Sequence, residues 1–227
     1  DACEAQDRLA CMAGSYVNQD GRSASMTAPN GPSQQLCIKA SLRMAGLQPP
    51  EVTMGELHGT GTALGDPIEV GAIRGVMTSS QPRTRPLLET SAKAMTGHLE
   101  ACAGAKGLMK CAVMVLASTA SPNCHLRILN GHLEVAGFPT YFLTELCDSS
   151  ENSGTCGVSS FGYGGTNARA DIWARCRRGP RKTGDLSVSA DRLKLEKLDY
   201  VSIPCPRCLG PMCWLCSMAI PVNAPAG

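Results

Sequence analysis

Three short apolar segments of this chain each run into a polar turn that contains glycine, and this repeated pattern restricts the fold more than any other feature. The segments cover residues 52–58, 87–93 and 156–161, a length and composition typical of strands. Glycine in the turns permits backbone conformations that other residues avoid. Ligand sites in α/β sheets form where strands end, so the pattern predicts a site at these turns.

Helical patterns lie between the predicted strands. Residues 33–45 have helical spacing of apolar residues, with Ser33 as the predicted N-cap. A second helix is predicted to begin at Asp66-Pro67, and a third covers residues 99–117. Alternating strands and helices predict a layered α/β/α fold.

Further strands are predicted at residues 9–17, 126–129 and 140–146. Polar and basic residues follow the last apolar segment. We therefore expect residues 1–174 to form the folded part of the chain, and residues 175–227 to be a basic linker and a poorly ordered cysteine-rich tail.

Composition disfavours several classes of protein. A formal net charge of +2 gives no electrostatic reason to expect nucleic acid or an anionic membrane as a partner. The longest apolar run, residues 111–117, is far shorter than the roughly 20 residues that span a bilayer. Thirteen cysteines, an odd number, disfavour a secreted disulfide framework. We expect a cytoplasmic protein, or a plastid protein if a targeting segment precedes residue 1.

His58 and His98 follow two of the predicted strands, and we expect them to face one cavity. Two neutral imidazoles can donate hydrogen bonds to a carbonyl oxygen and stabilise an enolate, and Lys93 adds positive charge. The alternative is that each histidine is a structural hydrogen-bond donor. The Gly-Thr-Gly-Thr turn at residues 59–62 lacks the lysine and the spacing of a phosphate-binding loop, so no nucleotide is expected.

Several motifs together resemble the β-ketoacyl synthase family, specifically the C-terminal half of ketosynthase domains of modular (type I) polyketide synthases. They occur in the family's order and approximate spacing over residues 7–173. The matching segments are residues 18–23, 27–34, 56–62, 65–69 and 164–167, together with Lys93 and His98. The resemblance implies a thiolase-like fold and a decarboxylative Claisen condensation of acyl and malonyl-type thioesters in polyketide or fatty-acid biosynthesis.

The resemblance also implies roles for single residues. His58 and His98 look like the two histidines that promote decarboxylation and hold the thioester carbonyl, and Lys93 looks like the lysine that supports the second histidine. Thr60 and Thr62 resemble the threonines that bind the phosphopantetheine arm of acyl carrier protein. The other implied substrate-binding positions are Phe161, Tyr163 and Gly164. No cofactor of the chain's own is implied, because the carrier's phosphopantetheine holds the substrates.

The chain departs from the family at several positions, one of which is Thr96, where an Asn is usual. It has no Thr-Ala-Cys-Ser-Ser type turn, which carries the family's nucleophilic cysteine. Tyr163, whose N–H matches an oxyanion-hole donor of the family, replaces the usual Phe, and Arg169 replaces a common His. Cys102 and Cys111 fall on the predicted third helix and are interpreted as buried packing. We therefore expect an acyltransferase that is inactive as this fragment alone.

The resemblance implies three partners: acyl carrier protein, an N-terminal ketosynthase half that carries the cysteine, and a second copy in a homodimer of the full form. The alternative is a non-catalytic ketosynthase-like module that binds acyl carrier protein or a complete ketosynthase.

The tail contains two Cys-x-x-Cys pairs, the unit from which four-thiolate zinc sites are built. Their cysteines are Cys205, Cys208, Cys213 and Cys216. Only four residues separate the pairs, whereas paired structural zinc sites usually leave roughly 15 to 20. A flexible tail without metal is the favoured interpretation, and a zinc site is the alternative.

Overall fold

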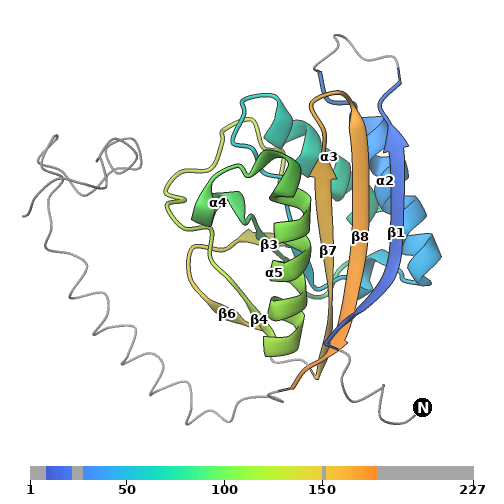
Figure 1. Cartoon of the computed structure of the whole chain (residues 1–227), viewed down its shortest axis with the longest axis vertical. Helices are drawn as coiled ribbons and strands as arrows, with labels where there is room; N and C mark the ends of the chain where they lie inside the picture. The colour runs from blue at the N-terminus through green and yellow to red at the C-terminus, as the bar shows by residue number, and fades with distance from the viewer. Residues whose placement is uncertain (1–8, 22–27, 150–151, 178–227) are drawn as a thin grey trace, which may run out of the picture. The chain divides into compact units, whose positions relative to one another are not determined.

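The computed structural model describes residues 9–21, 28–149 and 152–177, which form a central sheet with helices on both faces (Figure 1). The strands are β1 (Cys11–Gln19), β2 (Met54–Glu56), β3 (Leu87–Thr90), β4 (Thr119–Ala120), β5 (Thr140–Phe142), β6 (Cys147–Asp148), β7 (Ser153–Phe161) and β8 (Thr166–Arg175). The α-helices are α2 (Gly31–Ala45), α3 (Gly65–Met77), α4 (Lys93–Thr96) and α5 (Ala103–Ala117), with 3₁₀ turns at Pro49–Glu51 and Glu100–Cys102. The predicted layered α/β/α fold is confirmed.

The main sheet has six strands in the order β1-β8-β7-β2-β3-β5. The pairs β1–β8 and β7–β8 are antiparallel, whereas β7, β2, β3 and β5 are parallel neighbours. Strands β4 and β6 pair separately in a two-stranded sheet. Because β7, β2 and β3 are parallel, their carboxyl ends lie at one edge of the main sheet.

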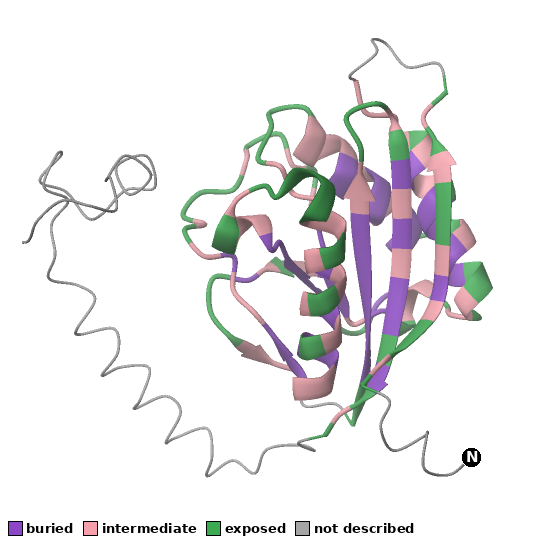
Figure 2. Cartoon of the chain, viewed as in Figure 1, coloured by how far each residue is buried: buried purple, intermediate pink, exposed green. Residues whose placement is uncertain are grey.

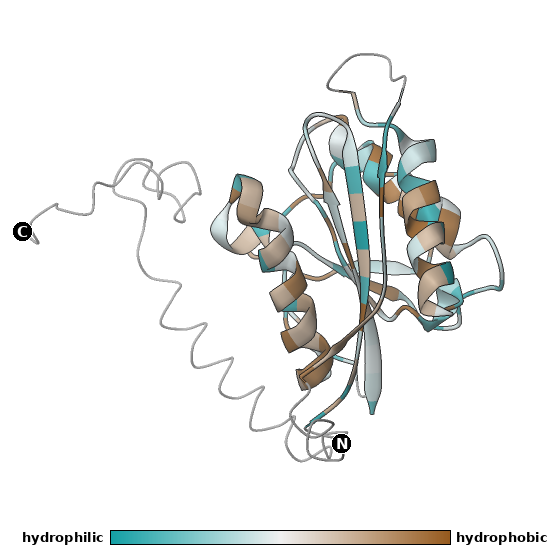
Figure 3. Cartoon of the chain, turned by 45° about the vertical axis from the view of Figure 1, so that its right-hand side comes forward, coloured by the Kyte–Doolittle hydropathy of each residue, from teal (hydrophilic) through white to brown (hydrophobic). Residues whose placement is uncertain are grey.

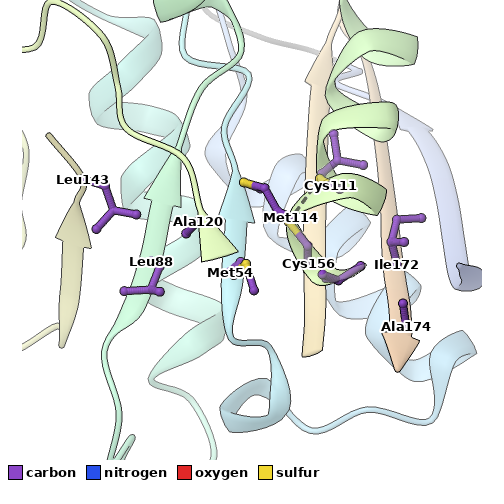
Figure 4. Packing of buried hydrophobic residues seen from close by; sticks show 11 residues of the cluster. Met54, Leu88, Cys111, Met114, Ala120, Leu143, Cys156, Ile172 and Ala174 are labelled. Carbon is purple, nitrogen blue, oxygen red and sulfur yellow. Dashed lines mark hydrogen bonds between the residues drawn. The ribbon is translucent and has the colours of Figure 1, made fainter. Parts of the chain in front are cut away.

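Two hydrophobic clusters hold the layers together. Helix α5 packs on β7 and β8, and α2 packs on β1 and α3 on the other side of the sheet. The α5 cluster includes Met54, Cys111, Met114, Cys156 and Ile172, all at most 4% exposed (Figure 4). The second cluster contains residues of α2 and α3, among them Ile38, Leu42, Ile73 and Val76. Strand β7, covered by both layers, is buried over most of its length (Figure 2).

Helix α2 begins before the predicted cap. Its N-cap is Asn30, whose side-chain oxygen accepts the N–H of Ser33 at 3.2 Å. Ser33, the residue predicted to cap the helix, therefore lies in the first turn, and its hydroxyl donates to the Asp20 carbonyl. The predicted end is confirmed, because Gly46 adopts a left-handed conformation (φ +67°) after the last turn.

The predicted helix over residues 99–117 is wrong at its start. Glu100 has a left-handed backbone (φ +48°), which a continuous helix does not allow, and α5 begins at Ala103. Cys111 is fully buried as expected. Cys102 lies before α5 and is exposed, so its interpretation as a buried packing residue is wrong.

The segment at residues 126–129 forms no strand, contrary to prediction. Its first N–H bonds back to the carbonyl of Asn123 in a turn, and Ile128 is 88% exposed. The predicted strand at residues 140–146 is shorter, because the Leu143 carbonyl accepts hydrogen bonds from Asn123 and not from a neighbouring strand.

Two glycines make room for ionisable side chains between the sheet and the helices that cover it. Gly55 of β2 and Gly157 of β7 are register partners. The Glu89 carboxylate occupies the space where a side chain at Gly55 would begin, and the Arg169 guanidinium occupies that space at Gly157. Arg169 forms an ion pair with Asp171 at 2.9 Å, and a serine hydroxyl of α2 donates to the same carboxylate. The side chains of Glu89, Arg169 and Asp171 are all at most 3% exposed.

The structure limits two other expectations. Of the expected tail, only residues 175–177 are described, so its four Cys-x-x-Cys cysteines lie outside the described residues. Within the described ranges, no helix combines the length and apolar character needed to cross a bilayer.

Candidate active site

The three predicted turns meet at one edge of the sheet, because they follow the parallel neighbours β2, β3 and β7. The His58 and His98 rings lie edge to face, with centroids 5.9 Å apart. The Phe161 ring, at the end of β7, lies 5.6 Å from His58. The structure thus brings together residues from three separate segments, as the pattern of strands and turns led us to expect.

A buried carboxylate holds the turn after β2. Glu69 of α3 accepts the N–H groups of His58 at 2.6 Å and Gly59 at 2.8 Å, one on each oxygen. Burial raises the pKa of Glu69 to about 7, although these two hydrogen bonds act in the opposite direction. Gly59 has φ +48° and lies against the Ser91 side chain, so a larger residue would be strained there.

The His58 imidazole is neutral at physiological pH. Burial, followed by the nearby Lys93 ammonium, lowers the pKa of His58 to about 4. Its Nδ1 atom accepts the backbone N–H of Phe161 at 3.3 Å. A neutral ring whose Nδ1 is an acceptor carries its proton on Nε2, so Nε2–H of His58 is a hydrogen-bond donor.

In the His98 ring, as in the His58 ring, Nδ1 is the hydrogen-bond acceptor. The Nδ1 atom of His98 accepts the backbone N–H of Glu100 at 2.8 Å. Gly97, with φ +73°, turns the chain just before His98. Because Nδ1 accepts this hydrogen bond, the ring proton lies on Nε2, and His98 also presents Nε2–H as a donor.

Lys93 contacts the first histidine. Its ammonium donates to the His58 carbonyl oxygen and lies 3.4 Å from His58 Nδ1. Burial lowers the pKa of Lys93, while Glu69, Glu56 and Asp66 oppose this effect. The expectation that Lys93 supports the second histidine therefore differs from the geometry, in which its direct partner is His58.

Sequence reasoning missed Glu56 and Glu69 as site residues, although both lie in segments that it examined. Glu56, 3% exposed, accepts bonds from the Ala92 N–H, the Thr90 hydroxyl and Lys110, the last at 2.7 Å. It thereby anchors the start of the segment that carries Lys93. The sequence signal that could have identified them is an acidic residue at a position where the apolar pattern predicts a buried side chain. Glu56 lies at the end of a predicted strand, and Glu69 lies on the apolar face of a predicted helix.

The other predicted substrate-binding residues lie on the turns that follow β2 and β7. The Thr60 and Thr62 hydroxyls are 3.4 Å apart, and Thr62 accepts the Gly65 N–H at the start of α3. Tyr163 is 83% exposed in the β7–β8 turn, and the neighbouring Gly164 carbonyl accepts a bond from Gln19. The structure places Phe161 against His58, whereas Tyr163 and Gly164 have no described contact with either histidine.

The described cysteines do not complete this site. Eight of them are described and all are free thiols. Within the described ranges, none is hydrogen-bonded to His58 or His98. The same part of the chain contains no group of three or more histidine, cysteine or acidic side chains arranged to hold a metal ion.

Comparison with known proteins identifies similar sequences and folds. The family model described as β-ketoacyl synthase, C-terminal domain, matches residues 9–127. The chain is 41% identical over 175 residues to a phenolphthiocerol/phthiocerol polyketide synthase protein of Mycobacterium tuberculosis, and 40% identical over 182 residues to erythronolide synthase EryA2 of Saccharopolyspora erythraea. Each alignment covers 76% of this chain, but only 9% and 5% of these long relatives.

The fold is also similar to solved ketosynthase structures. The ketosynthase from module 6 of the bacillaene synthase of Bacillus subtilis superimposes with a TM-score of 0.72 at 30% sequence identity. The match covers 89% of this chain and 38% of that ketosynthase. The chain therefore spans well under half of a ketosynthase of this kind.

Proposed function

Because the chain belongs to the β-ketoacyl synthase family, we propose that it supplies the histidine-bearing half of a site that decarboxylates and condenses carrier-bound thioesters. One observation carries this proposal: the Nδ1 atoms of His58 and His98 both accept backbone N–H groups. The two rings, 5.9 Å apart, thus provide two Nε2–H donors in one place.

These donors suit the charge that forms during decarboxylation. When the bond between the α-carbon and the carboxylate of a malonyl-type thioester breaks, CO₂ leaves and its electron pair stays behind as an enolate. The negative charge develops on the thioester oxygen, where Nε2–H of His58 and His98 can stabilise it. The α-carbon of the enolate then attacks an acyl thioester on a cysteine, and that cysteine leaves as a thiolate.

Lys93 and Glu69 prepare His58 for this role. The Lys93 ammonium beside Nδ1 disfavours protonation of the ring, so His58 remains a neutral donor and does not become a cation. Glu69 fixes the backbone of the His58 turn through its two N–H bonds. Thr60 and Thr62, on the same turn, are proposed to bind the phosphopantetheine arm of acyl carrier protein.

The acyl-bearing cysteine is proposed to come from an N-terminal ketosynthase half that packs on α5. The surface of α5 supports this, because the helix is mainly white to brown in Figure 3, with few hydrophilic residues. Met109 and Val113, one helical turn apart, are 64% and 65% exposed. An exposed apolar stripe of this kind is typical of a protein–protein contact. The chain alone is then proposed to lack condensing activity.

The test measures CO₂ release from labelled malonyl-acyl carrier protein by the full chain. We expect release above the uncatalysed rate, and a loss of roughly 100-fold or more in His58→Ala and in His98→Ala, since one oxyanion donor typically contributes that much. His132→Ala is the matched control, because His132 is an exposed histidine in a loop. No condensed product is expected unless a cysteine-bearing N-terminal half is added.

Equal CO₂ release by the wild type and by both site variants would overturn the proposal. Binding of acyl carrier protein without any CO₂ release, with and without an N-terminal half, would instead support the non-catalytic module.

A further inference from the structure

Two buried thiols face each other across the interface between α5 and the sheet. Cys111 lies in the middle of α5 and Cys156 on β7, and both are 0% exposed. Figure 4 shows the two sulfur atoms pointing toward each other, and the Cys156 thiol donates to Cys111 Sγ at 3.1 Å. This contact plays no part in the proposed condensing site.

The geometry favours bond formation between the sulfurs over metal binding. A disulfide is about 2.05 Å long, so the two sulfurs need to approach by only about 1 Å. A tetrahedral zinc ion with bonds of about 2.3 Å would hold its sulfurs roughly 3.8 Å apart. No described histidine or carboxylate joins the pair in a group suited to a metal.

Cys37 provides a contrast within the same protein. It is also 0% exposed, but its thiol donates to the Tyr16 carbonyl at 3.4 Å and to the Asn167 carbonyl at 3.7 Å. Its partners are backbone oxygens on strands, with which it cannot form a covalent bond. Burial alone therefore does not distinguish Cys111 and Cys156 from Cys37. The difference is that the thiols of Cys111 and Cys156 have each other's sulfur as a partner.

We propose that Cys111 and Cys156 form a disulfide when the chain folds in the presence of a low-molecular-weight disulfide oxidant such as oxidised glutathione. One cysteine thiolate attacks the oxidant, giving a mixed disulfide and one reduced glutathione. The second cysteine thiolate displaces the other glutathione and closes the protein disulfide. The two protons lost by the cysteines are taken up by the two glutathione thiolates, so two thiols are oxidised and one disulfide is reduced.

Burial determines when this reaction occurs. Desolvation and the neighbouring Cys111 raise the pKa of Cys156, which makes a thiolate unfavourable in the closed core. The bond therefore forms before α5 docks on the sheet, or while α5 opens transiently. Once closed, the same burial shields the bond from reductants. The link would join α5, which begins just after His98, to β7, which ends at Phe161.

The experiment refolds the full reduced chain in a glutathione redox buffer, alkylates the remaining thiols and maps the linked peptides by mass spectrometry. Digestion with trypsin and a glutamate-specific protease separates Cys147 from Cys156 at Glu151, and fragment spectra distinguish Cys111 from Cys124. We expect the Cys111–Cys156 peptide to be the main linked species in the folded fraction.

The link closes a loop of 45 residues, and a disulfide of that span should raise Tm by roughly 10 °C. Both the linked peptide and the rise in Tm should be lost in Cys111→Ala and in Cys156→Ala, and kept in the matched control Cys37→Ala. Full alkylation of Cys111 and Cys156 at every glutathione ratio would overturn the proposal, as would links that join other cysteines in their place. The wild-type peptide map decides this even where a variant folds poorly.

Discussion

Replacing Glu89 by glutamine should increase the stability of this chain above neutral pH. The Glu89 carboxylate is 2% exposed, lies over Gly55, and has one oxygen, Oε2, without a hydrogen-bond partner. Burial raises the pKa of Glu89 to about 8, and the nearby Glu69 carboxylate adds to the effect. The folded chain thus holds a proton on Glu89 that the unfolded chain releases near pH 4.5.

The sign and size of the effect follow from this difference. A carboxyl whose pKa is raised by folding stabilises the protein fully below its unfolded pKa, and that stability is lost as pH rises through the folded pKa. With pKa values of 4.5 and about 8, the free energy of unfolding should fall by about 3 kcal/mol between pH 5.5 and pH 8, at about 1.36 kcal/mol per pKa unit. Glu69, with its pKa raised to about 7, adds a smaller part of the same slope.

Urea unfolding of the full chain at several pH values measures this slope. Glu89→Gln mimics the protonated side chain, so it should remove about 3 kcal/mol of the fall in unfolding free energy between pH 5.5 and pH 8. The smaller fall caused by Glu69 should remain. Glu134→Gln is the control, because the Glu134 side chain is 85% exposed and pairs with Arg74 at the surface. An unchanged slope in Glu89→Gln would refute the reasoning from burial.

Three further predictions concern single positions. His58 should titrate near pH 4 in nitrogen NMR spectra of the imidazoles, and a transition between pH 6 and 7 would contradict its burial. Gly157→Ala should destabilise the fold by about 3 kcal/mol or more in urea unfolding, because the new methyl group meets the Arg169 guanidinium. Its control is Gly71→Ala on α3, which has open space around it and should be neutral or stabilising by up to ~1 kcal/mol. Asn30→Ala should cost about 1 kcal/mol through loss of the α2 cap, and an unchanged unfolding midpoint would show that the cap contributes little.

The strand-and-turn pattern was sufficient to predict that His58 and His98 lie close together. The turns that carry His58 and His98 follow parallel strands, and the order of those strands brings the rings together. Periodicity was less reliable where one residue changes the backbone. Glu100 adopts a left-handed conformation that no helical pattern reveals, so the predicted helix began too early and Cys102 was placed in the core.

Sequence reasoning did not identify the partners of the buried acidic side chains. Glu56 and Glu69 occupy positions where the apolar pattern predicts burial, but acidic side chains are usually exposed, so the pattern alone did not identify them as buried. Their burial depends on partners that are distant in sequence, such as Lys110 for Glu56 and the His58 turn for Glu69. The contact between Lys93 and His58, 35 residues apart, likewise required the folded chain.

The glycine-lined space beneath α2 restricts how this chain can be recombined with its relatives. Glu89 on β3 lies over a glycine of β2, and Arg169 on β8 lies over a glycine of β7. A chimera that took β7 and β8 from a relative without a buried arginine would lose the cation beside Glu89, and one that took β2 alone would place a side chain where the Glu89 carboxylate lies. Strands β2, β3, β7 and β8 therefore need to come from the same parent protein. Crossovers that preserve the fold should fall outside residues 54–175.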